Sequence, residues 1–306
     1  MSEPGDLPIV DAHQHFWDLD RNYYPWLCDA EPIPFRYGDY SPLRRNYLPP
    51  DYRADTARYR ILGTVHVEAE WDRAAPVAET RWLETIAARH GLPSGIVAHA
   101  ALDGEAAADT VARQAESPLA RGIRHKPRAA ASPSEARRGE AGSMDDPRWR
   151  RGYAALDRHG LSFDLQTPWW HLDAAADLAR DFPRTQIVIN HTGLPADRSP
   201  EGLTGWRRAL EAVADCPNVA VKISGLGQPG GAWTVETNGP VIRDTVSIFG
   251  SDRCLFASNY PVDSLVASFN TIVEVMRSAL SGLSPEDRAR IFSGNAIRLY
   301  RLGIGS

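Results

Sequence analysis

The 306-residue sequence contains only three cysteines, which are widely spaced and include no CxxC pair: Cys28, Cys216 and Cys254. Such a set excludes a cysteine-based zinc knuckle and a disulfide framework, both of which need regularly spaced cysteines. Free thiols are typical of the reducing cytoplasm. The opening residues, Met-Ser-Glu-Pro-Gly-Asp, also lack the apolar segment of a secretory signal peptide. We therefore expect a cytoplasmic protein.

Long hydrophobic runs and basic clusters are missing as well. No apolar stretch approaches the ~18 residues that a membrane-spanning helix requires, and the mean hydropathy is -0.37. The formal net charge is -5, and no basic block forms the electrostatic footprint of a nucleic-acid-binding protein. We expect neither a membrane nor a nucleic acid as a partner, and predict a small-molecule substrate instead.

Short β-rich runs alternate with longer helical stretches along the whole chain. Several of the runs are apolar on both faces, as strands of a buried parallel sheet should be. The predicted strands are residues 9–16, 61–69, 95–102, 122–126, 162–166, 186–191, 219–224 and 254–258. The predicted helices include residues 78–90, 173–182, 202–214, 241–249 and 264–280, with a further helix starting at Ser284.

About eight βα units in a chain of this length are typical of one closed barrel. The alternative is a doubly wound α/β sheet, but such a sheet normally has fewer strands, and no GxGxxG motif opens a helix here. We therefore predict a (β/α)8 TIM barrel that forms a single domain over residues 1–306.

Two segments interrupt this alternation. Residues 17–60 form a long insertion after the first strand, rich in Pro, Tyr, Trp and Arg, and residues 127–147 form an irregular stretch after the fourth strand. Both follow the carboxyl ends of strands, where the active sites of barrels lie, and loops of this length usually act as lids or binding loops. The aromatic residues of the insertion predict either a lid or the contact of a homodimer: Trp17, Tyr23, Tyr24 and Trp26.

Histidines stand at the carboxyl ends of two predicted strands. His13 and His15 lie two residues apart on the first strand, so their side chains point the same way. Two neighbouring imidazoles suit a divalent metal or a pair of groups that polarise a carbonyl. His191 leaves the apolar sixth strand just before Thr192-Gly193 and is placed for the same two roles.

The second strand ends with His66 and Glu68, again two residues apart. We expect His66 to contact the substrate. Glu68 is a candidate metal ligand or general base, and the alternative is a structural carboxylate paired with an arginine.

Other strand ends supply groups that could recognise a substrate. Arg124 closes the fourth strand, where a cation suits a bound carboxylate or phosphate. Gln166 ends the fifth strand, and Trp170 follows it. An amide and an aromatic side chain together predict a pocket wall that contacts a polar or ring-shaped substrate. Lys222 on the seventh strand either contacts the substrate or belongs to a buried ion pair.

The motifs His13-Gln-His15, Ile-Asn-His191-Thr-Gly and Ser-Asn-Tyr-Pro-Val-Asp together resemble the amidohydrolase superfamily, and within it the amidohydrolase 2 group of TIM-barrel hydrolases. The resemblance covers residues 9–303. This group includes lactonases of sugar acids, a pyrone dicarboxylate lactonase and metal-dependent decarboxylases. The resemblance implies that His13, His15 and His191 bind a divalent metal such as Zn or Mn, or polarise the substrate carbonyl without a metal.

The chain departs from the group at the end of the eighth strand. An aspartate there commonly accepts a proton from the attacking water, and its position aligns with Asn259, in Ser-Asn-Tyr-Pro where many relatives read Ser-Asp-Trp-Pro. An asparagine cannot ionise and cannot act as a general base. Asp263 and Glu68 are the carboxylates available to replace it, while Asn259 would either orient the water or coordinate a metal through its carbonyl oxygen.

These observations predict an enzyme, namely a hydrolase that opens a sugar lactone or a carboxylated lactone with activated water. Two alternatives stay open. One is a metal-dependent decarboxylase of an unsaturated or aromatic acid, and the other is a non-catalytic ligand-binding relative that has lost the general base.

Overall fold

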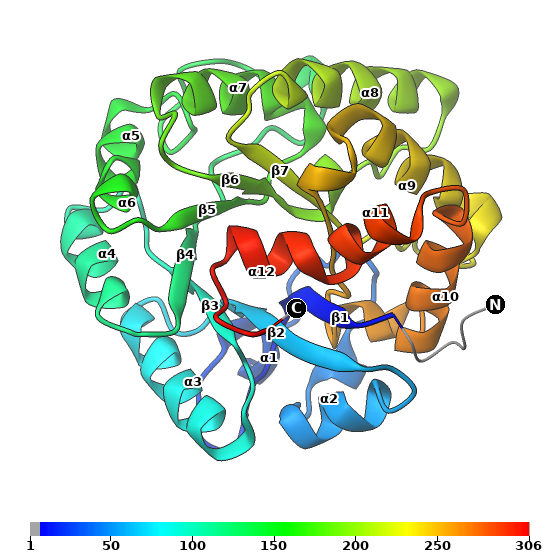
Figure 1. Ribbon diagram of the computed structural model, residues 1–306. Helices are drawn as coiled ribbons and strands as arrows, with labels where there is room; N and C mark the ends of the chain where they lie inside the picture. The colour runs from blue at the N-terminus through cyan, green and yellow to red at the C-terminus, as the bar shows by residue number, and fades with distance from the viewer. Residues whose placement is uncertain (1–6, 306) are drawn as a thin grey trace.

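The computed structural model describes residues 7–305. Residues 1–6, which carry no apolar segment in the sequence, and residue 306 lie outside the described part. A ring of strands surrounded by helices makes up the fold (Figure 1). No helix in residues 7–305 has the length and apolar character needed to cross a bilayer.

Eight parallel strands follow one another around the barrel in chain order, and each pairs with the next. They are β1 (Ile9–Gln14), β2 (Ile61–Val67), β3 (Gly95–His99), β4 (Ala120–Arg124), β5 (Ser162–Leu165), β6 (Ile187–Ile189), β7 (Val219–Ile223) and β8 (Cys254–Phe256). A parallel bridge between Gln14 and Tyr260 joins the ends of the first and last strands. The predicted TIM barrel is therefore confirmed, with strands that are mostly shorter than expected because their last residues turn into loops.

Helices fill the connections between the strands. They are α1 (Pro25–Cys28), α2 (Pro49–Asp55), α3 (Pro76–His90), α4 (Ala107–Ala115), α5 (Pro147–Tyr153), α6 (Ala155–Arg158), α7 (Leu172–Asp181), α8 (Pro200–Ala214), α9 (Val235–Phe249), α10 (Phe269–Ala279), α11 (Pro285–Ala289) and α12 (Asn295–Leu299). Ser284 caps α11 by accepting a hydrogen bond from the backbone N–H of Asp287, as its sequence predicts. The helix predicted over 264–280 begins only at Phe269, because Ser268 caps it there.

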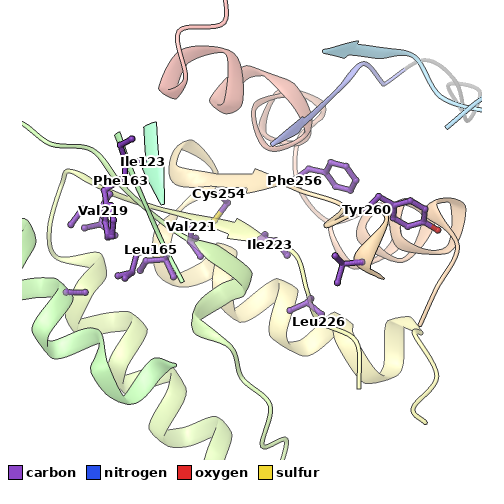
Figure 2. Close-up of a cluster of buried hydrophobic side chains, with 14 of the residues drawn as sticks. Ile123, Phe163, Leu165, Val219, Val221, Ile223, Leu226, Cys254, Phe256 and Tyr260 are labelled. Carbon is purple, nitrogen blue, oxygen red and sulfur yellow. The ribbon is translucent and has the colours of Figure 1, made fainter. Parts of the chain in front are cut away.

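Two apolar layers hold the barrel together. The outer layer lies between strands and helices, and Figure 2 shows part of it, with Phe163 of β5, Val221 of β7 and Phe256 of β8. The inner layer consists of small and branched side chains inside the ring, including Val65 and Val188. Residues of α12 and the segment after it complete this inner layer, and Figure 1 shows α12 lying across the middle of the ring.

The insertion over residues 17–60 contains helices α1 and α2 and packs onto the barrel. Trp17 and Tyr24 are almost fully buried, so these two aromatic residues belong to the core and are not exposed for a dimer contact. The Trp17 indole N–H donates to the carbonyl oxygen of Arg45, 2.7 Å away. Trp26 stacks on Phe35 with 5.8 Å between the ring centroids, which stiffens the part of the insertion that lies over the strand ends.

Candidate active site

A pocket of about 600 Å³ opens at the carboxyl ends of the strands. Its floor includes side chains that follow five different strands: His15, Arg124, Gln166, His191 and Asn259. The insertion supplies one wall, with Trp26, Phe35 and Arg36. A concave site with apolar walls and a few convergent polar groups is the usual form of a small-molecule site, and strand carboxyl ends are where TIM barrels place it.

The rings of three histidines lie close together at this pocket. The ring centroid of His13 lies 5.0 Å from that of His15 and 4.7 Å from that of His191. The pairing of β1 with β2 is irregular between Asp11 and Gln14, and His13 and His15 lie within and just after this stretch. The site thus brings together the three residues that the HxH motif and the sixth strand predict.

Hydrogen bonds fix how these rings are presented. His15 Nδ1 lies 2.7 Å from the carbonyl oxygen of Val67, so Nδ1 carries the proton and Nε2 keeps its lone pair. His191 Nδ1 lies 2.9 Å from the hydroxyl of Ser224. Both ring nitrogens of His13 are buried and have no hydrogen-bond partner within residues 7–305.

Burial and nearby cations keep these histidines neutral. Desolvation lowers the pKa of His15 well below its usual value, and Arg124 lowers it further. Desolvation and then Lys222 lower the pKa of His13, and desolvation and then Arg36 lower that of His191. At neutral pH the site therefore offers three uncharged imidazoles in a surrounding that favours negative charge.

Arg124 and Glu68 form a buried ion pair on the floor of the pocket. The guanidinium Nε donates to Glu68 Oε1 at 2.7 Å, and a second guanidinium nitrogen donates to the Glu68 backbone oxygen. Arg124 also donates to Gln166 Oε1 at 3.2 Å. Burial alone would raise the pKa of Glu68, but Arg124 holds it well below its usual range. Glu68 is therefore ionised and fully engaged, which leaves it poorly placed to accept a proton from water.

Asn259 lines the pocket, and a hydrogen bond to Asp263 determines the orientation of its side-chain amide. Its Nδ2 donates to Asp263 Oδ1 at 2.6 Å, so its Oδ1 is the atom left for the pocket. The backbone of Asn259 has a φ of 57°, a left-handed conformation that asparagine tolerates better than most residues. Asp263 is fully buried behind Asn259, and burial raises its pKa. Asp263 thus orients Asn259 and is not among the pocket-lining residues.

Two other predicted substrate contacts, Lys222 and Trp170, are not among the residues that line the pocket. Lys222 is fully buried and forms an ion pair with Asp164 at 2.5 Å, the second of the two roles left open for it. The Trp170 indole donates to the Ala130 backbone oxygen at 3.1 Å.

His66 is turned toward helix α3. Its Nδ1 accepts a hydrogen bond from the Phe16 backbone N–H at 3.0 Å, so Nε2 carries the proton and faces Glu79 Oε1 at 3.3 Å. Desolvation lowers the pKa of His66 to about 3. Desolvation, with a smaller contribution from Glu68, raises the pKa of Glu79 to about 8. Both members of this buried pair are therefore mostly uncharged at pH 7.

The Glu79 proton makes stability depend on pH. Between pH 4.5 and about 8 the folded chain keeps this proton while the unfolded chain releases it, so the contribution of Glu79 to the free energy of unfolding falls as pH rises across that interval. We expect Glu79→Gln to remove this contribution from the slope of stability against pH, because glutamine does not ionise while its oxygen still accepts from His66. Urea unfolding at pH 5 and pH 8.5 measures the slope. Glu116→Gln, at an exposed side chain, is the control, and an unchanged slope in Glu79→Gln would contradict the assignment.

Sequence patterns did not single out Arg36 and Tyr37, which the insertion places at the site. Arg36 lines the pocket, and the Tyr37 hydroxyl donates to Asp263 Oδ1 at 2.9 Å. Only the Arg- and aromatic-rich composition of residues 17–60 hinted at such a contribution. Contacts between residues more than 220 positions apart carry no local periodic signal.

The residues present do not form a closed metal centre. The free Nε2 of His15 and the unpartnered nitrogens of His13 have the right chemistry for a divalent ion. However, no three His, Cys, Asp or Glu side chains of the described residues are close enough to hold one. The cations Arg36, Arg124 and Lys222 all act on these imidazoles, and the nearby carboxylate of Glu68 is held by Arg124. This donor set does not fit a closed metal site, so the steps proposed for the pocket use side chains alone.

The fold and the site define a TIM barrel with a histidine-rich pocket at its strand ends. The sequence model of the Amidohydrolase family matches residues 10–302, and the chain belongs to that family, whose members typically depend on a metal.

Three similar proteins span almost the whole chain. An uncharacterised protein of Sinorhizobium fredii is 38% identical, over 97% of this chain and all of its own length. An L-fucono-1,5-lactonase of Burkholderia ambifaria is 30% identical, over 96% of this chain and 95% of its own. The crystal structure of a Burkholderia multivorans amidohydrolase with bound zinc superposes with a TM-score of 0.77 at 25% identity, over 96% of this chain and 99% of that one.

Proposed function

We propose that this protein is a lactonase that hydrolyses the lactone of a sugar acid. One observation carries the proposal: neutral imidazoles, a buried arginine and an oriented amide oxygen converge on one pocket at the strand ends. The similarity to an L-fucono-1,5-lactonase supports the reaction class. Trp26, Phe35 and Trp71 line the pocket and offer apolar faces on which a sugar ring packs.

The reaction follows from the free atoms of the site. The water oxygen adds to the lactone carbonyl carbon, and one water proton passes to the free Nε2 of His15. The carbonyl oxygen takes the electron pair and becomes an oxyanion, whose negative charge makes the neighbouring imidazole more basic. The C–O bond of the ring then breaks, and the ring oxygen takes the proton from His15. The product is an open-chain hydroxy acid, which releases its acidic proton to solvent.

Asn259 and His191 have supporting roles in this scheme. Asn259 accepts a hydrogen bond from the attacking water through Oδ1, because its amide nitrogen is held by Asp263. His191 faces the pocket while its Nδ1 is held by Ser224, and it stabilises the oxygen that becomes negative. A mechanism of this kind needs no carboxylate at position 259.

A panel of lactones tests the proposal. The purified protein is assayed with 1,5- and 1,4-lactones of sugar acids and with carboxylated lactones, and acid release is followed with a pH indicator. We expect hydrolysis of at least one sugar lactone well above the spontaneous rate. Activity only on carboxylated lactones would move the substrate class to those compounds. Protein that is folded but hydrolyses none of them would sink the proposal and favour the ligand-binding alternative.

Measurements on the same protein sample distinguish the decarboxylase alternative from the lactonase proposal. Metal content is measured, and release of carbon dioxide from unsaturated and aromatic acids is followed before and after chelation. We expect lactone hydrolysis to change less than about twofold on chelation, because the proposed steps use side chains alone. Loss of that activity, with recovery on adding zinc or manganese, would show that the histidines hold a metal.

The free thiols of Cys28, Cys216 and Cys254 support the further proposal of a reducing cytoplasmic setting.

A further inference from the structure

Four cations line the pocket, and three of them form short ion pairs with two carboxylates. Arg124 is paired with Glu68 at 2.7 Å, while Arg73 and Lys126 both form ion pairs with Glu70. Cations held in short ion pairs have part of their hydrogen-bonding capacity already occupied. The fourth cation, Arg36, is different.

Within residues 7–305, Arg36 contacts a single carboxylate, and that contact is long. Its guanidinium lies 3.4 Å from Asp263 Oδ1, the same oxygen that accepts from Asn259 at 2.6 Å and from Tyr37 at 2.9 Å. Asp263 Oδ1 is thus largely saturated by shorter bonds. The Arg36 side chain is 31% exposed and lines the pocket, so most of its hydrogen-bonding capacity remains available to a bound molecule.

The fold holds Arg36 in this place from two sides. On one side its guanidinium carbon lies 4.6 Å from the centre of the Tyr37 ring, and the Tyr37 hydroxyl is anchored to Asp263. On the other side lies Gly225, with a φ of 60°. A Cβ atom there would stand 2.9 Å from the guanidinium and 2.6 Å from His191 Nδ1. The bare backbone of Gly225 therefore lets Arg36 and His191 approach each other.

We propose that Arg36 is a substrate-contacting residue that binds the carbonyl oxygen of the lactone as it becomes an oxyanion. It then holds the carboxylate of the product. A guanidinium presents several N–H donors in a planar fork that matches both of these oxygen groups. This role rests on the proposed lactonase function and adds a charged group from the insertion to the neutral His191 as stabilisers of the oxyanion. Barrel and insertion must accordingly be docked for full activity.

Substitutions of Arg36 test the proposal on the whole protein. We expect Arg36→Gln to lower kcat/KM on the best lactone about 100-fold, mainly through kcat, because the contact strengthens as charge develops. We expect Arg36→Lys to recover only part of this loss, because a point charge lacks the fork. Added guanidinium ion should partly restore an Arg36→Gly variant. Arg21→Gln is the matched control, since Arg21 lies in the same insertion with a side chain that is 78% exposed.

A second variant separates position from charge. Gly225→Ala keeps the Arg36 side chain, but the added Cβ atom forces Arg36 and His191 apart. We expect this variant to lower kcat. Its thermal midpoint is measured alongside.

The outcomes are distinct. If the wild type hydrolyses a lactone and Arg36→Gln keeps its kcat, the role of Arg36 is wrong while the proposed function stands. If Arg36→Lys loses as much kcat as Arg36→Gln, guanidinium does not restore Arg36→Gly, and the thermal midpoint falls, Arg36 only holds the insertion in place. If the wild type hydrolyses no lactone, the proposed function itself fails.

Discussion

Replacing His191 by alanine is expected to lower kcat for lactone hydrolysis about 100- to 1,000-fold, the usual cost of removing one group that stabilises an oxyanion. The expectation rests on where the ring lies. It borders the pocket, its centroid is 4.7 Å from that of His13, and Ser224 holds its Nδ1. Because these contacts orient the ring toward developing charge, the loss should appear in kcat more than in KM.

The measurement is steady-state kinetics on every lactone that the wild type hydrolyses. His159→Ala is the control, because His159 is exposed at the end of helix α6 and does not line the pocket. Ser224→Ala should give a smaller loss in the same parameter, since the ring stays but turns more freely. Unchanged turnover of His191→Ala on all of these substrates would show that His191 takes no part in the proposed mechanism.

Replacing Lys222 by methionine is expected to lower the free energy of unfolding by about 3–5 kcal/mol, the usual cost of leaving one member of a buried ion pair uncompensated. Lys222 and Asp164 are both fully buried inside the barrel, 2.5 Å apart. Asn190 and Tyr300 also donate to Asp164, at 2.9 and 2.8 Å, but neither of them carries a positive charge. The carboxylate would remain buried without its counter-ion.

Urea unfolding followed by circular dichroism measures this loss at pH 7. Arg184→Ala provides the comparison, because Arg184 forms an ion pair with Asp157 while its side chain is 81% exposed, and such surface pairs contribute about 0–1 kcal/mol. A double variant, Lys222→Met with Asp164→Leu, should recover much of the stability by removing both charges. A loss in Lys222→Met no larger than in Arg184→Ala would show that water reaches the pair.

Strand patterns made the barrel predictable. Each apolar run contains a strand, because buried parallel strands need apolar side chains on both faces. After several of these strands, such as Ile187–Ile189, residues at or just beyond the strand end line the pocket. The same logic placed His13, His15, Arg124 and His191 at the strand ends, where the structure finds them.

Partners of charged residues were much harder to foresee. Lys222 pairs with a residue 58 positions away and His66 with one on the following helix, and neither pairing leaves a local pattern. The role of Asp263 depends on Tyr37, 226 positions away, and on the turn at Asn259. Such contacts depend on how the helices, strands and loops pack against one another. A single sequence indicates which positions are apolar and therefore buried, but not which polar side chains meet.

Residues 295–304 give the barrel an unusual order of assembly. Ala296, Leu299, Tyr300 and Leu302 fill the inside of the ring beside Val10 and Val65. The ribosome makes these four residues after the last strand, so a nascent chain carries eight complete strands before it holds the side chains that complete their interior. We expect protease resistance of stalled nascent chains to rise sharply only once Leu302 has left the exit tunnel, and a gradual rise from the fourth strand onward would contradict this.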